Sequence, residues 1–201
     1  MGRINKQMKG NTMTEMNTLH TEAFADLAAI EATVAAVTEQ RELGKVSFSM
    51  LSQSAGGLTA ETVTGPLTQA GIADESRRGK FTLHSDEPVS LLGTDTAVSP
   101  AEYILKALAG CYMVTLASLA AGRNIPLKHV GLTLGFDIDL SGFLGIDDSV
   151  RKGAQQITVD VRIESPGTSR EDLEDLIVAL EATSPIRDTL ANPVPVLTRL
   201  V

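Results

Sequence analysis

The sequence predicts an α+β protein with antiparallel sheet, and two features carry that prediction. The stretches Val130–Leu140 and Ile157–Ile163 alternate apolar with polar residues, which is typical of strands that have one dry and one wet face. A third stretch, Ser99–Gly122, is apolar on nearly all sides and has the length of a buried helix. The chain shows no internal repeat and no glycine-rich phosphate loop.

The N-terminal part divides into a tail and a helix. Residues 1–19 are polar and lack the apolar segment of a secretory signal, so we expect a disordered tail. Residues 20–43 carry apolar side chains every three or four positions until Gly44 interrupts the pattern, which predicts an amphipathic helix. This helix is short for a coiled coil, so we expect its apolar stripe to pack against the protein's own core. The stripe consists of Phe24, Leu27, Ile30, Val34 and Val37.

A hairpin and a further strand are expected next. Lys45–Gln53 alternates apolar with polar residues, and the pair Gly56-Gly57 separates it from a second strand over Leu58–Thr64. The segment Gly65–Gly79 contains proline, glycine and a run of charges, which is the composition of a loop. The alternation resumes over Lys80–Ser85, so a third strand leads toward the long apolar helix.

The long apolar helix has a well-specified start. Ser99, Pro100 and Glu102 occupy its N-cap, N1 and N3 positions, where the hydroxyl and the carboxylate can accept hydrogen bonds from free backbone amides. Gly122 supplies the C-terminal stop. Membrane insertion is disfavoured because Glu102 and Lys106 are charged and lie inside the stretch.

The C-terminal part is expected to continue with a loop, a helix and a strand. The linker Ser141–Ala154 is long for a hairpin loop, and its apolar residues would let it pack on another surface, such as a second subunit. Ser169–Ala182 has a cap, acidic residues at its start and an apolar stripe, which predicts a helix. Ser184 caps a short helical turn, and Val194–Leu200 is expected to be an edge strand because it contains Pro195.

Composition excludes several classes of partner. The net charge is −8, from 25 acidic and 17 basic residues, and it repels phosphate backbones and acidic membranes. We therefore expect neither nucleic acid nor membrane as a partner. The three histidines are scattered without metal-ligand spacing, so the sequence indicates no metal and no cofactor. One cysteine allows no intramolecular disulfide and suits a reducing cytoplasm.

The single cysteine, Cys111, lies in the middle of the long apolar helix. A cysteine in such a helix is most often an inert core residue. A reactive cysteine needs its thiolate, and Cys111 lies about three turns from the helix start, where the helix dipole has faded. A cation or another helix end would have to supply the stabilisation, and the residues alone leave both interpretations open.

Three separated segments resemble, in order, the motifs of the OsmC/Ohr family, specifically its OsmC-like branch. They are SDEPVSLLGTDTAVSPAEYILKALAGC at Ser85–Cys111, DIDLSGFLGI at Asp137–Ile146 and SPIRDTLANPVPV at Ser184–Val196. The resemblance extends from about Leu43 to the C-terminus, so we interpret residues 44–201 as an OsmC-like domain. It implies an α+β fold in which antiparallel sheets wrap around the two long central helices of an intertwined homodimer, with the sites at the subunit interface.

The resemblance also implies a chemistry. Characterised members of the family are thiol peroxidases that reduce organic hydroperoxides. The cysteine that matches Cys111 attacks the peroxide oxygen and becomes a sulfenic acid, and a second cysteine resolves it as a disulfide that a dithiol reduces. An arginine and a glutamate hold the first cysteine as a thiolate.

This chain departs from the family pattern at three positions. Ser184 stands where the resolving cysteine is expected, and its hydroxyl cannot form a disulfide, so we interpret it as a helix cap. Ala101 stands where the glutamate is expected, and the neighbouring Glu102 is already used in the helix cap. The arginine expected after Gly56-Gly57 is missing from the next three positions.

Three other arginines could replace the missing one. They are Arg77, Arg78 and Arg187, and Arg187 is of most interest because it follows Ser184 by three residues. The alternative is that each of these arginines faces solvent.

Two functions follow from these observations. The first is a one-cysteine reductase of small organic hydroperoxides, in which Cys111 reacts and an external thiol reductant resolves its sulfenic acid. The second is a protein of the same fold without peroxidase activity, whose interface pocket binds a small apolar or thiol-reactive ligand.

Overall fold

The structure is a computed structural model, and it describes residues 25–201. The predicted tail over residues 1–19 and the start of the predicted N-terminal helix lie outside the described residues. The helices are α1 (Leu27–Glu39), α2 (Pro100–Gly122), α3 (Leu140–Phe143), α4 (Arg170–Thr183) and α5 (Pro185–Ala191). The strands are β1 (Val46–Gly56), β2 (Thr59–Gln69), β3 (Ile72–Asp74), β4 (Thr82–Ser85), β5 (His129–Asp137) and β6 (Gln156–Glu164). Short 3₁₀ turns occupy Arg41–Gly44, Glu75–Arg77 and Val89–Leu91.

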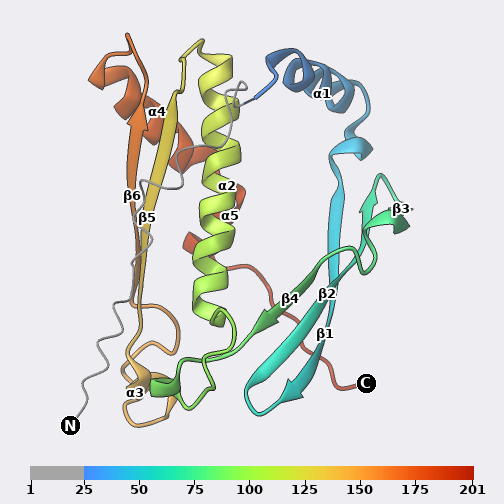
Figure 1. The fold of residues 1–201 in the computed structure, drawn as a ribbon. Helices are drawn as coiled ribbons and strands as arrows, with labels where there is room; N and C mark the ends of the chain where they lie inside the picture. Colours follow the sequence, from blue (N-terminus) through green and yellow to red (C-terminus); the bar gives the residue numbers. More distant parts are fainter. Residues whose placement is uncertain (1–24) are drawn as a thin grey trace, which may run out of the picture.

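Two antiparallel sheets lie on opposite sides of α2 (Figure 1). One is two-stranded and pairs β5 with β6 in continuous register from His129 opposite Glu164 to Asp137 opposite Gln156. The other has four strands, in which β2 pairs with β1, β3 and β4. The predicted α+β class with antiparallel sheet is therefore confirmed.

The core forms where one face of α2 meets α4 and the β5–β6 sheet. Its fully buried apolar side chains are Leu108, Tyr112, Leu116, Ala120, Val130, Leu176 and Leu180. Burial of a large aliphatic side chain contributes about 1.5–3 kcal/mol, so this face dominates the stability of the chain. By length and composition alone α2 could cross a bilayer, but here it is the central core helix.

The predicted start of α2 is confirmed. The Oγ of Ser99 accepts a hydrogen bond from the Glu102 N–H at 3.3 Å, and the Glu102 carboxylate accepts one from the Ser99 N–H at 2.8 Å. Immediately beyond this cap, the Tyr103 hydroxyl donates to the carbonyl of His84 in β4 at 2.7 Å. The start of α2 is thereby attached to the four-stranded sheet.

The buried carboxylate of Asp86 organises the segment between β4 and α2. It accepts hydrogen bonds from the backbone N–H groups of Glu87, Thr94 and Thr96 and from both threonine hydroxyls, at 2.6–3.1 Å. Gly93 completes this turn, because a Cβ there would collide with the backbone carbonyl of Glu87. These bonds fix the path by which the sheet leads into the N-cap of α2.

The loop predicted over Gly65–Gly79 is wrong for its first half, because β2 continues to Gln69 and β3 pairs with it. The proline, the glycine and the charges of this segment predicted a loop, but pairing with β1 extends the strand through Pro66. Pro66 lies at a β-bulge, where two residues of β2, Gly65 and Pro66, stand opposite the single residue Ser49 of β1. The register of the ladder shifts there, so the missing N–H of Pro66 is tolerated. The Gly56-Gly57 turn of the hairpin is confirmed, and both residues have positive φ.

The predicted end of one strand and the whole of another are also corrected. β5 stops at Asp137 rather than Leu140, because Asp139 caps α3 by accepting a hydrogen bond from the Ser141 N–H at 2.9 Å. The edge strand predicted over Val194–Leu200 is wrong, since residues 193–201 pair with no strand of the described chain.

The predicted N-terminal helix is present as α1, with Asp26 as its N-cap. Its last predicted residues form the 3₁₀ turn Arg41–Gly44 instead. None of its side chains is buried, and Val34 in its apolar stripe is 61% exposed. Phe24 lies outside the described residues, and the remaining members of the stripe are half-buried or exposed and not buried in the core as the sequence predicted.

We predict that Asp86→Asn lowers the Tm. The amide NH₂ group of asparagine would face the N–H and O–H groups of Thr94 or Thr96, which are also donors, so these hydrogen bonds would be lost. Hydrogen bonds from the Thr94 hydroxyl and the Thr96 N–H hold the pKa of Asp86 well below its usual 3.8, and burial only partly opposes them. Since the folded-state pKa is depressed, the stabilisation is present above about pH 3.8 and is lost as pH falls toward the folded-state pKa.

Thermal unfolding of both proteins from pH 7 to pH 2 checks this prediction. The Tm difference between wild type and variant should shrink at the acidic end. Asp147→Asn is the matched control, because Asp147 is an exposed turn aspartate that binds only Ser149. A Tm loss no larger than that of this control would contradict the assigned role of Asp86.

Candidate functional site

Cys111 lies near the middle of α2 and opens onto a groove of about 710 Å³. Cys111 is partly exposed. The groove walls come from α2 and from the junction of α4 with α5, and their side chains are mostly small or apolar. The lining residues are Lys106, Ala107, Gly110, Cys111, Val114, Thr115, Ser118, Leu119, Thr183, Pro185 and Ile186. The sulfur therefore faces a space with room for a small organic molecule.

The structure brings Ser184 to Cys111, although 73 residues separate them in the chain. The Cys111 Sγ lies 3.2 Å from the Ser184 Oγ and 4.0 Å from the Thr115 Oγ1. Ser184 is 1% exposed and is the N-cap of α5, as the sequence predicted. Its position is set because α4 ends and α5 begins at this residue.

The hydrogen bonds of Ser184 orient its hydroxyl toward the sulfur. Its N–H donates to the Leu180 carbonyl at 3.0 Å, and its Oγ accepts from the Arg187 N–H at 3.4 Å. A serine hydroxyl has one proton to donate. Because that Oγ already accepts a hydrogen bond from a backbone N–H, its own proton is free to point at the Cys111 sulfur.

The other candidate residues lie elsewhere. The Glu102 carboxylate is held by the helix cap, as described above. The Arg187 guanidinium donates to the Glu181 carbonyl at 3.1 Å and lines a different cavity from the Cys111 groove. Arg78 pairs with Glu75 at 2.7 Å, and Arg77 lies over the Phe81 ring at 5.6 Å. In the described chain, none of these three arginines lines the Cys111 groove.

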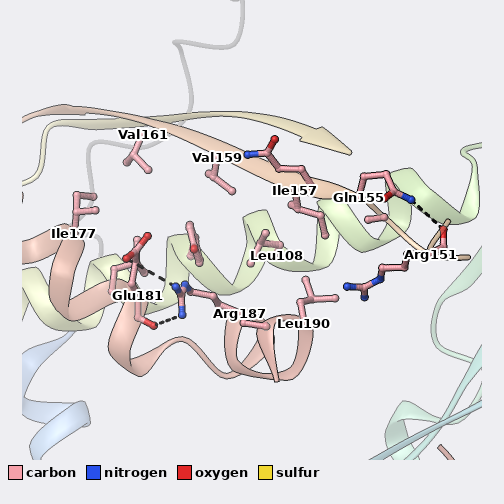
Figure 2. Close-up of a pocket in the computed structure, with 15 residues that line it drawn as sticks. Leu108, Arg151, Gln155, Ile157, Val159, Val161, Ile177, Glu181, Arg187 and Leu190 are labelled. Atoms are coloured by element: carbon pink, nitrogen blue, oxygen red, sulfur yellow. Dashed lines mark hydrogen bonds and ion pairs between the residues drawn. The ribbon is translucent and has the colours of Figure 1, made fainter. Parts of the chain in front are cut away.

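A second cavity, of about 340 Å³, lies between α2, β6 and the α4–α5 pair (Figure 2). The sequence analysis did not find it. Tyr112 and Leu108 reach it from α2, while Cys111 opens on the other groove. Burial raises the pKa of Tyr112, and the nearby Arg187 guanidinium opposes that rise. Tyr112 is therefore a neutral hydroxyl at pH 7.

No metal centre is visible in the part of the chain that the structure describes. Within residues 25–201, no three side chains of histidine, cysteine, aspartate or glutamate gather closely enough to hold an ion.

Comparison with known proteins decides the family. The sequence profile described as OsmC-like protein matches residues 93–199, which is more than half of the chain. The chain belongs to the OsmC-like family. The matched region covers α2, both strands of the smaller sheet and the two helices that carry Ser184. None of the curated proteins matches the chain in sequence.

Solved structures agree on the fold. An OsmC-like protein from Mycoplasma pneumoniae is 16% identical with a TM-score of 0.56, and the alignment covers 72% of this chain and 87% of that one. An organic hydroperoxide resistance protein OsmC from Legionella pneumophila is 17% identical with a TM-score of 0.51, covering 73% and 91% respectively. At these identities the likeness shows the shared OsmC-like fold.

Sequence reasoning did not assign two residues of the Cys111 groove to the site. Thr115 follows Cys111 by four residues, so helical spacing alone places both side chains on one face. Lys106 was noted only as a charge inside the helix, yet it lines the Cys111 groove. No local pattern could have found the second cavity, because its walls come from segments far apart in the chain.

We predict that Ser184→Ala lowers both stability and Cys111 reactivity. Loss of the α5 cap should cost about 1 kcal/mol, and loss of the hydroxyl donor should slow alkylation of Cys111 by iodoacetamide at pH 7. Ser169→Ala is the matched control, because Ser169 caps α4 by the same bond but does not contact the sulfur. Equal alkylation rates in the two variants would contradict the proposed Ser184–Cys111 contact.

Proposed function

We propose that this protein is a thiol-dependent redox protein that reduces small organic hydroperoxides with one cysteine, Cys111. The observation that carries the proposal is the Cys111 Sγ, 3.2 Å from the Ser184 hydroxyl at the opening of a largely apolar groove, in a chain of the OsmC-like family. The hydroxyls of Ser184 and Thr115 can stabilise the thiolate, and the groove walls can hold the organic substituent of a hydroperoxide.

The proposed reaction is a two-electron oxidation of sulfur. The Cys111 thiolate attacks one peroxide oxygen, so that an S–O bond forms while the O–O bond breaks. The sulfur becomes a sulfenic acid, and the alkoxide that leaves takes up a proton to become an alcohol. Lys106 lines the same groove, and its ammonium group is a source of positive charge for the departing alkoxide.

The proposed resolution uses an external thiol. The chain has one cysteine, and Ser184 cannot form a disulfide, so the sulfenic acid has no intramolecular partner. A first external thiol condenses with the sulfenic acid and releases water, leaving a mixed disulfide. A second thiol restores Cys111 and leaves the external pair as a disulfide. We propose a cytoplasmic location, because the cytoplasm supplies such thiols.

We also propose that two copies of the OsmC-like domain, residues 44–201, form the homodimer. In one chain every residue of β1 is exposed, including Phe48 at 78% and Leu51 at 69%. Val114 in the Cys111 groove is 69% exposed. Apolar side chains in such numbers on one sheet and one helix face are typical of an interface. Pairing would cover them and narrow the groove at Cys111.

A second function is supported by a different observation. Among the arginines that the sequence offered as activators, Arg77, Arg78 and Arg187, none lines the Cys111 groove of the described chain. The groove would then hold a small apolar or thiol-reactive ligand without peroxidase turnover. Absence of peroxide reduction together with tight binding in the groove would favour this function.

We predict that the reduced protein consumes cumene hydroperoxide about tenfold or more faster than free cysteine does, and that Cys111→Ser abolishes this activity. Stopped-flow kinetics with an excess of dithiothreitol measures the rate. A rate no higher than that of free cysteine would contradict the peroxidase proposal.

The Ser184→Cys variant tests the geometry independently. One equivalent of hydroperoxide should convert Cys111 and the new cysteine into an intramolecular disulfide, seen as the loss of both free thiols without dimer formation on a non-reducing gel. Ser118→Cys is the matched control, because Ser118 lines the same groove but donates to the Val114 carbonyl. The control should keep one reactive thiol and form no internal disulfide.

We predict a solution mass of twice the 21.2 kDa chain mass, measured by light scattering at micromolar concentration. Phe48→Asp should shift the mass toward the monomer, because it places a charge on the exposed face of β1. A wild-type protein that is monomeric under these conditions would contradict the dimer.

A further inference from the structure

The 340 Å³ cavity on the other face of α2 has the features of a binding site rather than a packing gap. Its volume is within the range of small-ligand pockets, which starts at about 300 Å³. One wall is aliphatic and comes from α2, β6, α4 and α5. The large aliphatic residues are Leu108, Ile157, Val159, Val161, Ile177, Leu180 and Leu190. Such a wall suits a hydrocarbon chain.

The polar side of the cavity includes the buried Tyr112 beside Arg187. Tyr112 is 5% exposed and lines the cavity, and its hydroxyl interacts with the Arg187 side chain. The guanidinium can only donate, so the tyrosine oxygen accepts from it and the hydroxyl proton stays available to a ligand in the cavity. Since burial keeps it neutral, it offers a hydrogen-bond donor. The Arg187 guanidinium is its charged neighbour.

The charge of the cavity favours an anion. Arg187 and Arg151 both extend into it, with Leu190 between them in Figure 2. Glu181 is the one acidic residue of the lining, and its carboxylate is 3.9 Å from the Arg187 guanidinium and 56% exposed. An exposed pair at that distance is weak. The cavity thus carries a net positive charge in a protein whose total charge is −8.

We propose that this cavity binds an aliphatic monocarboxylate, with the carboxylate held by Arg187 and Tyr112 and the chain lying along the aliphatic wall of β6. Arginine binds carboxylates in a bidentate manner, and the tyrosine hydroxyl supplies a third donor. At roughly 30 Å³ each, the volume that a water molecule occupies in the liquid, the cavity holds about eleven non-hydrogen atoms. This size corresponds to a medium-chain fatty acid.

The proposal stands apart from the redox function. The ligand would lie against Tyr112 and Arg187, whereas Cys111 opens on the other groove, so neither proposal requires the other. The two sites are adjacent through Ser184, which contacts Cys111 and caps the helix that carries Arg187.

Calorimetric titration of the reduced full-length protein with decanoate tests the proposal. Decanoate should bind at a single site below its micelle concentration. 1-Decanol, which lacks the negative charge, and butyrate, which lacks the long hydrocarbon chain, should each bind roughly tenfold or more weakly. Arg187→Gln should weaken decanoate binding by roughly tenfold or more, and Tyr112→Phe should weaken it by a smaller factor.

The controls separate this cavity from the Cys111 groove and from non-specific charge. Cys111→Ser and the surface variant Arg78→Gln should bind decanoate as the wild type does. Arg151→Gln should weaken binding less than Arg187→Gln. The proposal is overturned if decanoate fails to bind, if decanol binds equally well, or if the Arg187 and Tyr112 variants retain full affinity with an unchanged Tm.

Discussion

The burial of one face of α2 against α4 and the β5–β6 sheet is the interaction on which the rest of the structure depends. It aligns the helix so that Leu108, Tyr112 and Leu116 point into the core, and the helical turn then places Cys111 at the edge of that face. The same contact holds the C-terminal end of α4 beside the sulfur, where the chain turns at Ser184. Packing in the core thus sets the geometry of the candidate site.

Local sequence patterns predicted the elements that local physics determines. The cap formed by Ser99 and Glu102, the Gly56-Gly57 turn and the alternation in β5 and β6 each depend on residues close together in the chain. The errors have another origin. Pro66 is accepted in β2 because it lies in a bulge of β2 opposite Ser49 of β1, where its missing N–H is tolerated, and Val194–Leu200 finds no strand to pair with in the described chain. In both segments the outcome depends on whether and how a partner strand pairs with them, and a local sequence pattern carries no information about that partner.

In the candidate site, too, the sequence indicated which residues matter, whereas the packing of distant segments determines their geometry. Family resemblance brought Ser184 to notice, but its distance from the sulfur and the orientation of its hydroxyl depend on how α4 and α5 meet α2. Arg187 was of interest because of its position in the sequence, whereas its side chain extends toward Tyr112 and Glu181 in the other cavity. The consecutive residues Cys111 and Tyr112 of α2 face the thiol site and the positively charged cavity respectively, because neighbouring side chains of a helix point in directions about 100° apart.

The central claim is that Cys111, supported by the hydroxyl of Ser184, is the atom that reacts with hydroperoxide. Mass spectrometry after one equivalent of cumene hydroperoxide, with dimedone present to trap sulfenic acid, tests it most directly. The account predicts a dimedone adduct on the peptide that contains Cys111, and no adduct in Cys111→Ser. A Cys111 that remains fully reduced while the hydroperoxide is unconsumed would contradict it.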